Sequence, residues 1–282
     1  MSKRQSTLMF VGSLVISGMI FLQMSIYIIS MFAGWNVRFN LVAVCHSWIK
    51  AIGLSSLEYV LDAFVIYTLL FSVWKIGLHW FHAVRMKNRF ELYKENTLTI
   101  DMNQTHNSGK KEILVISHPA AIAITIGLIR PKIVISTGLM NLLNEDELTA
   151  VMYHEIYHKE SRDPLKIFLI SLCSSTFWYI PILKWFNQKY RIVNELLADG
   201  FAIEKQATSV NLGSALLKML KVAKQEKMPF SYASFADTSV NYRIDYLLNP
   251  FKDTQLKVPL RVVFLSLMIF SLICVLFIYA LA

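Results

Sequence analysis

The chain has 282 residues, of which 55% are hydrophobic and only 17% charged, and its mean hydropathy is +0.46. This apolar excess lies in discrete blocks, which excludes an ordinary soluble globular protein and predicts an integral membrane protein. The net charge of +9 comes largely from basic residues beside those blocks, so it fits membrane topology better than direct nucleic-acid binding.

Two apolar blocks, at about residues 8–33 and 57–81, are long enough to predict transmembrane helices. Basic residues precede the first block and follow the second: Lys3, Arg4, Arg85, Lys87, Arg89 and Lys94. Because such residues favour the cytoplasmic side, they predict a cytoplasmic N-terminus and a cytoplasmic segment after the second helix. Residues 1–82 are therefore the predicted N-terminal membrane region.

Residues 83 to about 112 are polar and basic, and we expect a juxtamembrane connection there. Three β-branched runs follow, at residues 112–117, 120–126 and 132–136, separated by glycine and proline. They predict two or three short strands in a small sheet.

The helix after these strands carries the pattern His154-Glu155-x-x-His158. Histidines four apart lie on one face of a helix, so both imidazoles can reach one metal ion. Glu155 is rotated by about 100° from His154, which suits a general base acting on the attacking water. The alternative is an exposed helix with two unrelated histidines.

Local signals mark both ends of this helix. Asn144 can cap its N-terminus, with Glu147 three residues later to complete a capping box. Asp163 and Pro164 are expected to end it.

The segment Leu165 to Phe186 is apolar for about 22 residues, the length of a transmembrane helix. A single crossing would place everything after it on the far side of the membrane from His154. Pro181 and the serine pair at 174–175 also make an unbroken helix less favourable. We therefore expect a re-entrant or interfacial hairpin, or a buried hydrophobic helix.

A catalytic zinc ion takes three protein ligands and keeps one position open. His154 and His158 supply two, and Glu195 on a later helix is the best candidate for the third. Asp199 lies one turn further on the same face, where it can accept a hydrogen bond from a ligating histidine. The alternative for Glu195 and Asp199 is a solvated acidic helix face.

The C-terminal residues 262–282 form a clean apolar span behind Lys252, Lys257 and Arg261. This basic flank predicts a helix that leaves the cytoplasm, with the C-terminus outside. The predicted organisation is a cytoplasmic metalloprotease domain at 83–258, with its hydrophobic segment 165–186, and a transmembrane helix at 259–282.

Together, His154-Glu-x-x-His158, Glu160 to Pro164 and Glu195-x-x-Ala198-Asp199 resemble the membrane-embedded gluzincin peptidases. They are most similar to the BlaR/MecR-type family, the metalloprotease part of bacterial β-lactam sensors. The stretch Gly127 to Val134 matches that family's Gly-x-x-x-Pro-x-Ile-Val pattern, and the resemblance covers about residues 115–250.

The resemblance implies a membrane α-helical protein with a cytoplasmic α+β gluzincin-like domain. It implies one zinc ion per chain, held by His154, His158 and Glu195, with Glu155 as the base and Asp199 behind the ligands. The family's sensors carry a large extracellular penicillin-binding domain after the last helix, and this chain stops there. We therefore do not expect antibiotic sensing through such a domain.

Arg243, Tyr190 and His118 are candidates for stabilising the oxyanion of the transition state. An ordinary salt bridge is the alternative for Arg243, and structural roles are favoured for the other two. An extended substrate could pair with a strand formed by Ala120, Ala121, Ile122, Ala123 and Ile124, although these residues would equally suit a core strand.

The leading hypothesis is thus a zinc endopeptidase at the cytoplasmic face of the cell membrane, which cleaves a repressor or a membrane-associated protein in signalling. Its expected partners are a protein or peptide substrate and the lipid bilayer, while the oligomeric state stays open. The alternatives are a quality-control or maturation protease, a non-enzymatic signalling protein on a protease fold, and a transporter or channel.

Overall fold

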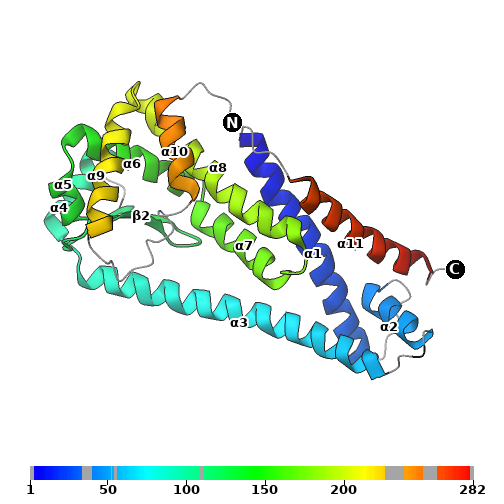
Figure 1. Ribbon diagram of the computed structural model, residues 1–282. Helices are drawn as coiled ribbons and strands as arrows, with labels where there is room; N and C mark the ends of the chain where they lie inside the picture. Colours follow the sequence, from blue (N-terminus) through cyan, green and yellow to red (C-terminus); the bar gives the residue numbers. More distant parts are fainter. Residues whose placement is uncertain are drawn as a thin grey trace. The chain divides into compact units, whose positions relative to one another are not determined.

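The computed structural model describes residues 3–33, 40–51, 53, 56–107, 111–225, 238–249 and 259–279. Over these ranges the chain is mostly helical and contains a three-stranded sheet (Figure 1). It divides into two compact units. The sheet unit comprises residues 1–6, 80–168 and 189–255, and the apolar unit comprises residues 7–79, 169–188 and 256–282.

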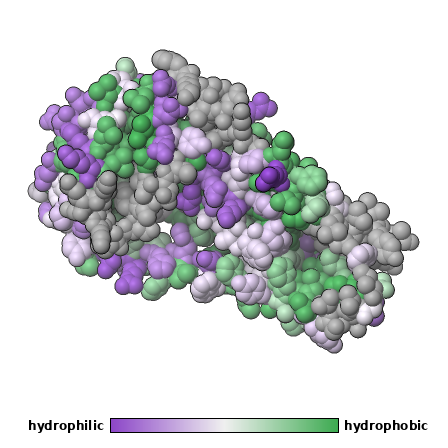
Figure 2. Space-filling view, in the orientation of Figure 1, coloured by the Kyte–Doolittle hydropathy of each residue, from purple (hydrophilic) through white to green (hydrophobic). Residues whose placement is uncertain are grey.

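Two helices, α1 (Lys3–Ala33) and α3 (Ser56–Leu92), are long and apolar enough to cross a membrane. Only 11% and 17% of their most apolar 18-residue windows are buried, whereas the core helix of a soluble protein would be mostly buried. In Figure 2, green and pale residues predominate over the apolar unit, and deep purple residues gather over the sheet unit. These two helices correspond to the predicted spans at about 8–33 and 57–81.

The apolar unit also contains α2 (Leu41–Ala51), which lies between the two predicted spans in the sequence, and α11 (Leu260–Tyr279). The described side chains of α11 form an apolar stretch at Leu260–Ile269, which is shorter than a membrane span. The third transmembrane helix, at 259–282, therefore stays a prediction, and residues 280–282 lie outside the described ranges.

The apolar segment 165–186 is a helical hairpin instead of one continuous helix. The first helix is α7 (Asp163–Thr176), and the second, α8 (Pro181–Gln206), begins at Pro181 after a short turn. Proline suits the first position of a helix because its φ is already fixed and no N–H partner is needed there. The turn between the two helices reverses the direction of the chain, and Glu195 lies further along α8.

Apolar contacts within the apolar unit hold this hairpin. Phe177 in the turn and Leu183 in α8 are buried with Met24 of α1 and Val65 of α3. Residues 169–188 therefore belong to the apolar unit, and they include most of the hydrophobic segment 165–186 that we predicted within the domain at 83–258.

The predicted connection at 83–112 is largely helical. Helix α3 continues to Leu92, and α4 (Asn96–Asn107) follows it. Phe90 near the end of α3 is buried with Leu114 and Ile116 of the sheet, so tertiary packing stabilises a helix that its polar sequence did not suggest.

The sheet contains β1 (Ile113–Ile116), β2 (Ala123–Ile126) and β3 (Lys132–Ser136), in the order β1-β3-β2. Strand β1 pairs with β3 in parallel and β2 pairs with β3 antiparallel. The prediction of two or three short strands in a small sheet is confirmed with three strands, and β2 begins at Ala123 and not at Ala120. Since β3 is central, β2 forms one edge of the sheet.

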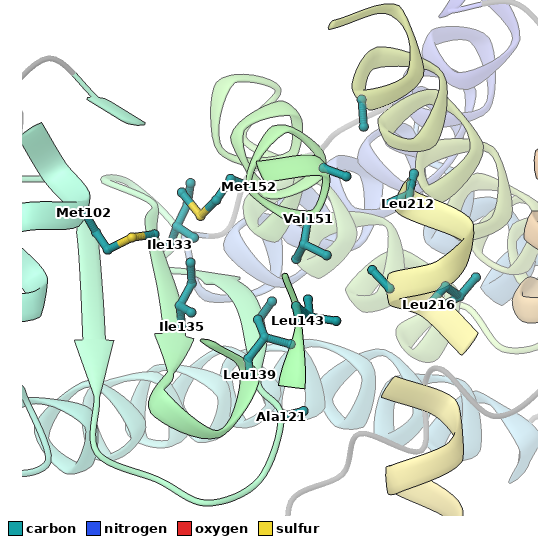
Figure 3. Close-up of a cluster of buried hydrophobic side chains, with 14 of the residues drawn as sticks. Met102, Ala121, Ile133, Ile135, Leu139, Leu143, Val151, Met152, Leu212 and Leu216 are labelled. Carbon is teal, nitrogen blue, oxygen red and sulfur yellow. The ribbon is translucent and has the colours of Figure 1, made fainter. Parts of the chain in front are cut away.

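Among the described residues, the core of the sheet unit is formed by the sheet and six helices. Helices α4 and α8 contribute Met102 and Ala202, and the other four are α5 (Thr137–Leu142), α6 (Glu145–Glu160), α9 (Val210–Gln225) and α10 (Thr238–Leu248). In Figure 3, Ile133 and Ile135 of β3 lie near Leu139 of α5 and Met152 of α6. This packing fixes α6, which carries the two predicted histidine ligands, against the sheet.

Candidate metal centre and active site

Helix α6 has the N-terminus that its sequence predicts. The Asn144 side chain accepts a hydrogen bond from Glu147 N at 2.8 Å, and the Glu147 carboxylate accepts one from Asn144 N at 3.0 Å. This confirms the capping box, which satisfies backbone donors that would otherwise lack partners.

The structure brings the three predicted ligands together. His154 Nε2 and His158 Nε2 lie 3.1 Å apart. Glu195 Oε2 lies 3.5 Å from His154 Nε2, and its Oε1 lies 3.7 Å from His158 Nε2. One ligand atom from each residue lies within 4.8 Å of the others. Two imidazole nitrogens and one carboxylate oxygen form the donor set of a catalytic zinc site, so these residues fit that ion.

A carboxylate holds the outer nitrogen of each imidazole. His154 Nδ1 lies 2.9 Å from Asp199 Oδ1, and His158 Nδ1 lies 2.7 Å from Asp163 Oδ2. These contacts orient both rings so that Nε2 faces the centre, which is the usual arrangement behind metal-binding histidines. Asp199 thus lies beside His154, which is one of the candidate ligands.

The contact made by Asp163 was missed, because its place before Pro164 suggested only the end of a helix. Helix α6 ends at Glu160, and Arg162 then adopts a φ of 53°, which is uncommon for a residue other than glycine. This sharp turn allows Asp163, the first residue of α7, to point back at His158. The presence of an aspartate only five residues after His158 could have indicated this contact in the sequence.

Arg243 on α10 is buried between two of these carboxylates. Its Nε and Nη2 donate to Asp199 at 2.8 and 2.7 Å, and its Nη1 lies 3.1 Å from Glu195 Oε2. It therefore holds both the candidate ligand and the carboxylate behind His154. This paired geometry agrees with the salt-bridge alternative, and the transition-state role remains a prediction.

These contacts change the ionisation of the centre in the metal-free chain. Burial and Arg243 oppose protonation of His154, but hydrogen bonds with Asp199 and Glu195 raise its pKa to about 9. Burial opposes ionisation of Glu195 and Asp199 as well, yet His154 and Arg243 hold both carboxyl pKa values below their usual range. The carboxylates therefore stay charged at neutral pH, as a cation site requires.

Glu155 is buried beside the cluster and is oriented by the edge strand. Thr125 of β2 donates a hydrogen bond to Glu155 Oε2 at 2.7 Å. Thr125 was not predicted, although its alternation with Ala123 along β2 places both residues on one face of the sheet.

A partly open pocket adjoins these groups, and the space within it, including space open to the solvent, is about 320 Å³. Its described lining consists of Ala123, Val151, His154, Glu155, Leu212, Leu216, Met219 and Arg243. The candidate base and one candidate ligand thus face a space that a substrate could enter.

The other predicted site residues lie elsewhere. His118 and Tyr190 are not among the described residues that line the pocket. His118 Nδ1 accepts a hydrogen bond from Ala120 N at 3.1 Å, and Tyr190 is buried.

Of the proposed substrate strand, only Ala123 and Ile124 belong to β2. The preceding residues Ala120, Ala121 and Ile122 are buried, and Ile122 O accepts a hydrogen bond from Ser136 N. Within the predicted stretch, only Ala123 and Ile124 therefore stay candidates for pairing with an extended substrate as part of β2.

Comparison with known proteins identifies the family of the chain. The family model "BlaR1 peptidase M56" matches residues 48–247, which is more than half of the chain. The chain is also 24% identical over 118 residues to "Regulatory protein BlaR1" of Bacillus licheniformis. That alignment covers 41% of this chain but only 19% of the relative, so the chain corresponds to a small part of that protein. On the family match, the chain belongs to the BlaR1 peptidase M56 family.

Proposed function

We propose that this chain is a membrane zinc endopeptidase whose active centre is built from His154, His158, Glu195 and Glu155. One observation carries the proposal: three residues with the ligand chemistry of catalytic zinc lie within 4.8 Å of one another, beside a buried glutamate that faces a pocket. Membership of the peptidase family supports the same conclusion.

His154, His158 and Glu195 would hold the ion, whose chemistry when bound is to polarise the scissile carbonyl and to lower the pKa of the attacking water towards about 7. Glu155 takes the proton from that water and passes it to the leaving amine. The new C–O bond replaces the C–N bond, so the products are a carboxylate and an amine. Thr125 keeps the Glu155 carboxylate aimed at this position.

The edge strand β2 is the element best suited to align the substrate. One side of β2 pairs with β3, and Ala123 on β2 lines the pocket beside Glu155. An extended peptide that added to the outer side of β2 would present its backbone next to the catalytic groups.

We place the active centre on the cytoplasmic side of the membrane. The support is the pair of uncovered apolar helices α1 and α3 and the exposed basic residues Arg85, Lys87 and Arg89 after the span in α3. A Glu160→Cys variant, in a chain whose three native cysteines are serine, tests this orientation. A membrane-impermeant maleimide should label it only after cells are permeabilised, and labelling of intact cells would reverse the assignment.

The proteolytic function is tested with the purified full chain in detergent. We expect about one zinc per chain and cleavage of casein, both abolished by a chelator. Glu155→Gln should retain zinc and lower the cleavage rate at least 100-fold, because the general base is lost. Glu160→Gln, an exposed glutamate on the same helix, is the matched control and should leave both unchanged. Full activity in Glu155→Gln would refute the mechanism.

A regulatory substrate is our choice among the substrate classes, because the matched relative is described as a regulatory protein. The alternative is general cleavage of damaged or immature membrane proteins. Membranes from cells with the wild-type chain and with Glu155→Gln would be compared by proteomics. One or a few fragments specific to the wild type would support regulation, whereas many fragments from misfolded proteins would favour quality control.

A further inference from the structure

The turn between β2 and β3 carries apolar residues where turns usually carry polar ones. Residues 127–131, which we call the hairpin tip, have the sequence Gly-Leu-Ile-Arg-Pro. Ile129 is 73% exposed, and Arg130 beside it is exposed as well. A single exposed isoleucine is common on protein surfaces, so the place of the hairpin tip in the fold decides whether this residue has a role.

The backbone defines how the hairpin tip presents its side chains. Gly127 adopts a φ of 99°, and a Cβ atom at this position would lie only 2.9 Å from Arg130 O. Glycine is therefore required for this tight turn. Ile126 and Lys132 pair directly before and after the tip, so Ile129 lies at the closed end of a well-defined hairpin.

The register of the sheet shows which of its two ends carries the hairpin tip. Ile116 at the end of β1 forms a bridge with Lys94, which lies just after the end of α3. Ile113 at the start of β1 pairs with Ile133, next to the hairpin tip. The hairpin tip is therefore at the end of the sheet opposite to the end of α3.

Helix α3 packs against the same sheet before it ends. Phe90 and Met86 belong to one apolar cluster with Ile124 and Ile126, the two half-buried isoleucines of β2. Because α3 ends at the far end of the sheet, its earlier turns lie toward the hairpin tip. Helix α3 enters the sheet unit at Trp80, so the hairpin tip lies on the side from which α3 arrives.

That side of the sheet unit adjoins the bilayer. A hydrocarbon core of roughly 30 Å takes about 20 helical residues, so a span that begins at Tyr59 ends at about Leu78. Trp80 and Phe81 follow and are both exposed, at the level where membrane helices carry interfacial aromatic residues. Arg85 lies one turn beyond them and is also exposed.

We infer that the hairpin tip is a membrane contact, in which Ile129 inserts into the lipid surface and Arg130 binds the phosphate of an anionic phospholipid. Apolar side chains and cations are the two groups that such a surface takes up, at the acyl boundary and at the headgroups respectively. The contact holds the edge strand β2, and with it Thr125 beside Glu155, at the level of the membrane surface.

Charge favours lipid over a second copy of this chain as the occupant. Residues 80–90 of α3 and residues 120–136 around the hairpin contain basic but no acidic residues. Two copies that met through these segments would bring like charges together, whereas anionic headgroups complement them. The inference rests on α3 as a membrane span and goes beyond the proposed function, since it requires neither zinc nor proteolysis.

The test uses the full chain in lipid nanodiscs, with its three native cysteines replaced by serine. An NBD fluorophore attached through Ile129→Cys should be quenched by brominated lipid tails at least about twofold more strongly than one attached through Leu92→Cys. Leu92 is the matched control because it is 82% exposed at the opposite end of the sheet. Leu70→Cys, at an exposed position within the span of α3, gives the quenching of a probe in lipid. Equal quenching at 129 and 92 would overturn the inference.

The charge of the lipid tests the role of Arg130. Adding phosphatidylglycerol to phosphatidylcholine nanodiscs should increase the quenching of the probe at position 129. Arg130→Gln should remove this increase, whereas Lys221→Gln, at an exposed lysine on α9, should retain it. An increase of the same size in Arg130→Gln would overturn the binding of an anionic headgroup by Arg130.

A water-soluble quencher distinguishes lipid from protein as the cover of the hairpin tip. Acrylamide should quench the probe at 129 less than the probe at 92. Protection from acrylamide without quenching by brominated lipid would mean that protein covers the tip, which would overturn the inference. Because these measurements need no zinc, their failure would leave the peptidase proposal standing, and a failure of zinc binding or casein cleavage would leave the membrane contact standing.

Discussion

The two histidines of the candidate metal centre are one helical turn apart, yet they are supported in different ways. His158 is held by Asp163, which lies only five residues further along the chain. His154 is held by Asp199 of α8, and Asp199 is in turn held by Arg243 of α10. One side of the centre is therefore built locally, and the other requires three helices that are distant in sequence.

This difference separates two tasks of the surrounding carboxylates. Asp163 orients an imidazole and makes its contact within a single turn between α6 and α7. Asp199 orients the other imidazole and also balances the buried charge of Arg243, which contacts the candidate ligand Glu195 as well. Loss of Asp199 should therefore affect both metal binding and folding, whereas loss of Asp163 should act mainly on the metal.

The largest effect is expected for Asp199→Ala. Zinc affinity should fall about 10- to 100-fold because His154 loses its orienting partner. The free energy of unfolding should fall by about 3–5 kcal/mol, since Arg243 then keeps a buried charge with only Glu195 beside it. Zinc titration with a competing chelator and urea unfolding of the metal-free chain measure the two quantities.

A paired replacement sharpens this prediction. Asp199→Leu combined with Arg243→Met removes both charges and should recover much of the lost stability, because an apolar pair can substitute for a buried ion pair. Zinc affinity should stay low, since His154 is still unsupported. Recovery of zinc affinity in the double variant would show that Asp199 acts only through the fold.

Asp163→Ala should have the same kind of effect on the metal but a smaller effect on the fold. We expect zinc affinity to fall about tenfold or more and the free energy of unfolding to fall by roughly 1.5–3 kcal/mol, the range for a hydrogen bond to a charged group. The same two assays apply. A stability loss equal to that of Asp199→Ala would contradict the distinction between the local and the long-range side.

The contrast also explains which parts of the site could be predicted from sequence. His154, Glu155 and His158 follow from one helical repeat, and Asn144 and Glu147 follow from a capping pattern, so local spacing was sufficient. Glu195 and Asp199 share a helix face at the same spacing and needed only the assumption of a shared metal. Asp163 was equally local, but its position before Pro164 indicated a helix end and concealed its contact with His158.

Contacts between separate helices and strands could not be predicted from the sequence as readily. The hydrogen bond from Thr125 to Glu155 depends on how the edge strand packs against α6, and the pocket wall from α9 depends on helix packing. The continuation of α3 to Leu92 was missed for the same reason, since burial of Phe90 against the sheet favours a helix in a polar stretch. The break of the segment 165–186 into two helices agrees with the sequence argument from Pro181 and the shared metal site, and how the segment meets the membrane stays a prediction.

The Glu147 side chain makes both a local and a long-range contact. A substitution at this residue can therefore compare the contributions of the two kinds of contact to stability. Its carboxylate accepts a hydrogen bond from Asn144 N within the cap of α6, and it accepts others from Ser214 and Lys218 of α9. Burial opposes ionisation of Glu147, but the contacts from Lys218, Ser214 and Asn144 outweigh it and lower the pKa. Glu147→Gln preserves an acceptor for the cap and removes the charge that α9 recognises.

The effect of Glu147→Gln should be the smallest and should depend on pH. Because the pKa of Glu147 in the folded chain lies below its reference value of 4.5, the carboxylate stabilises the fold fully above that pH and loses this effect as pH falls through the folded value. Since Lys218 is partly exposed, we expect a loss of about 1 kcal/mol at pH 7. Urea unfolding of the metal-free chain, measured against the wild type from pH 7 to below pH 4, should show this difference shrinking with acidity, while the exposed Glu145→Gln stays close to the wild type throughout. A difference that persisted at the lowest pH would assign the stabilisation to the shape of the cap and not to the charge contact with α9.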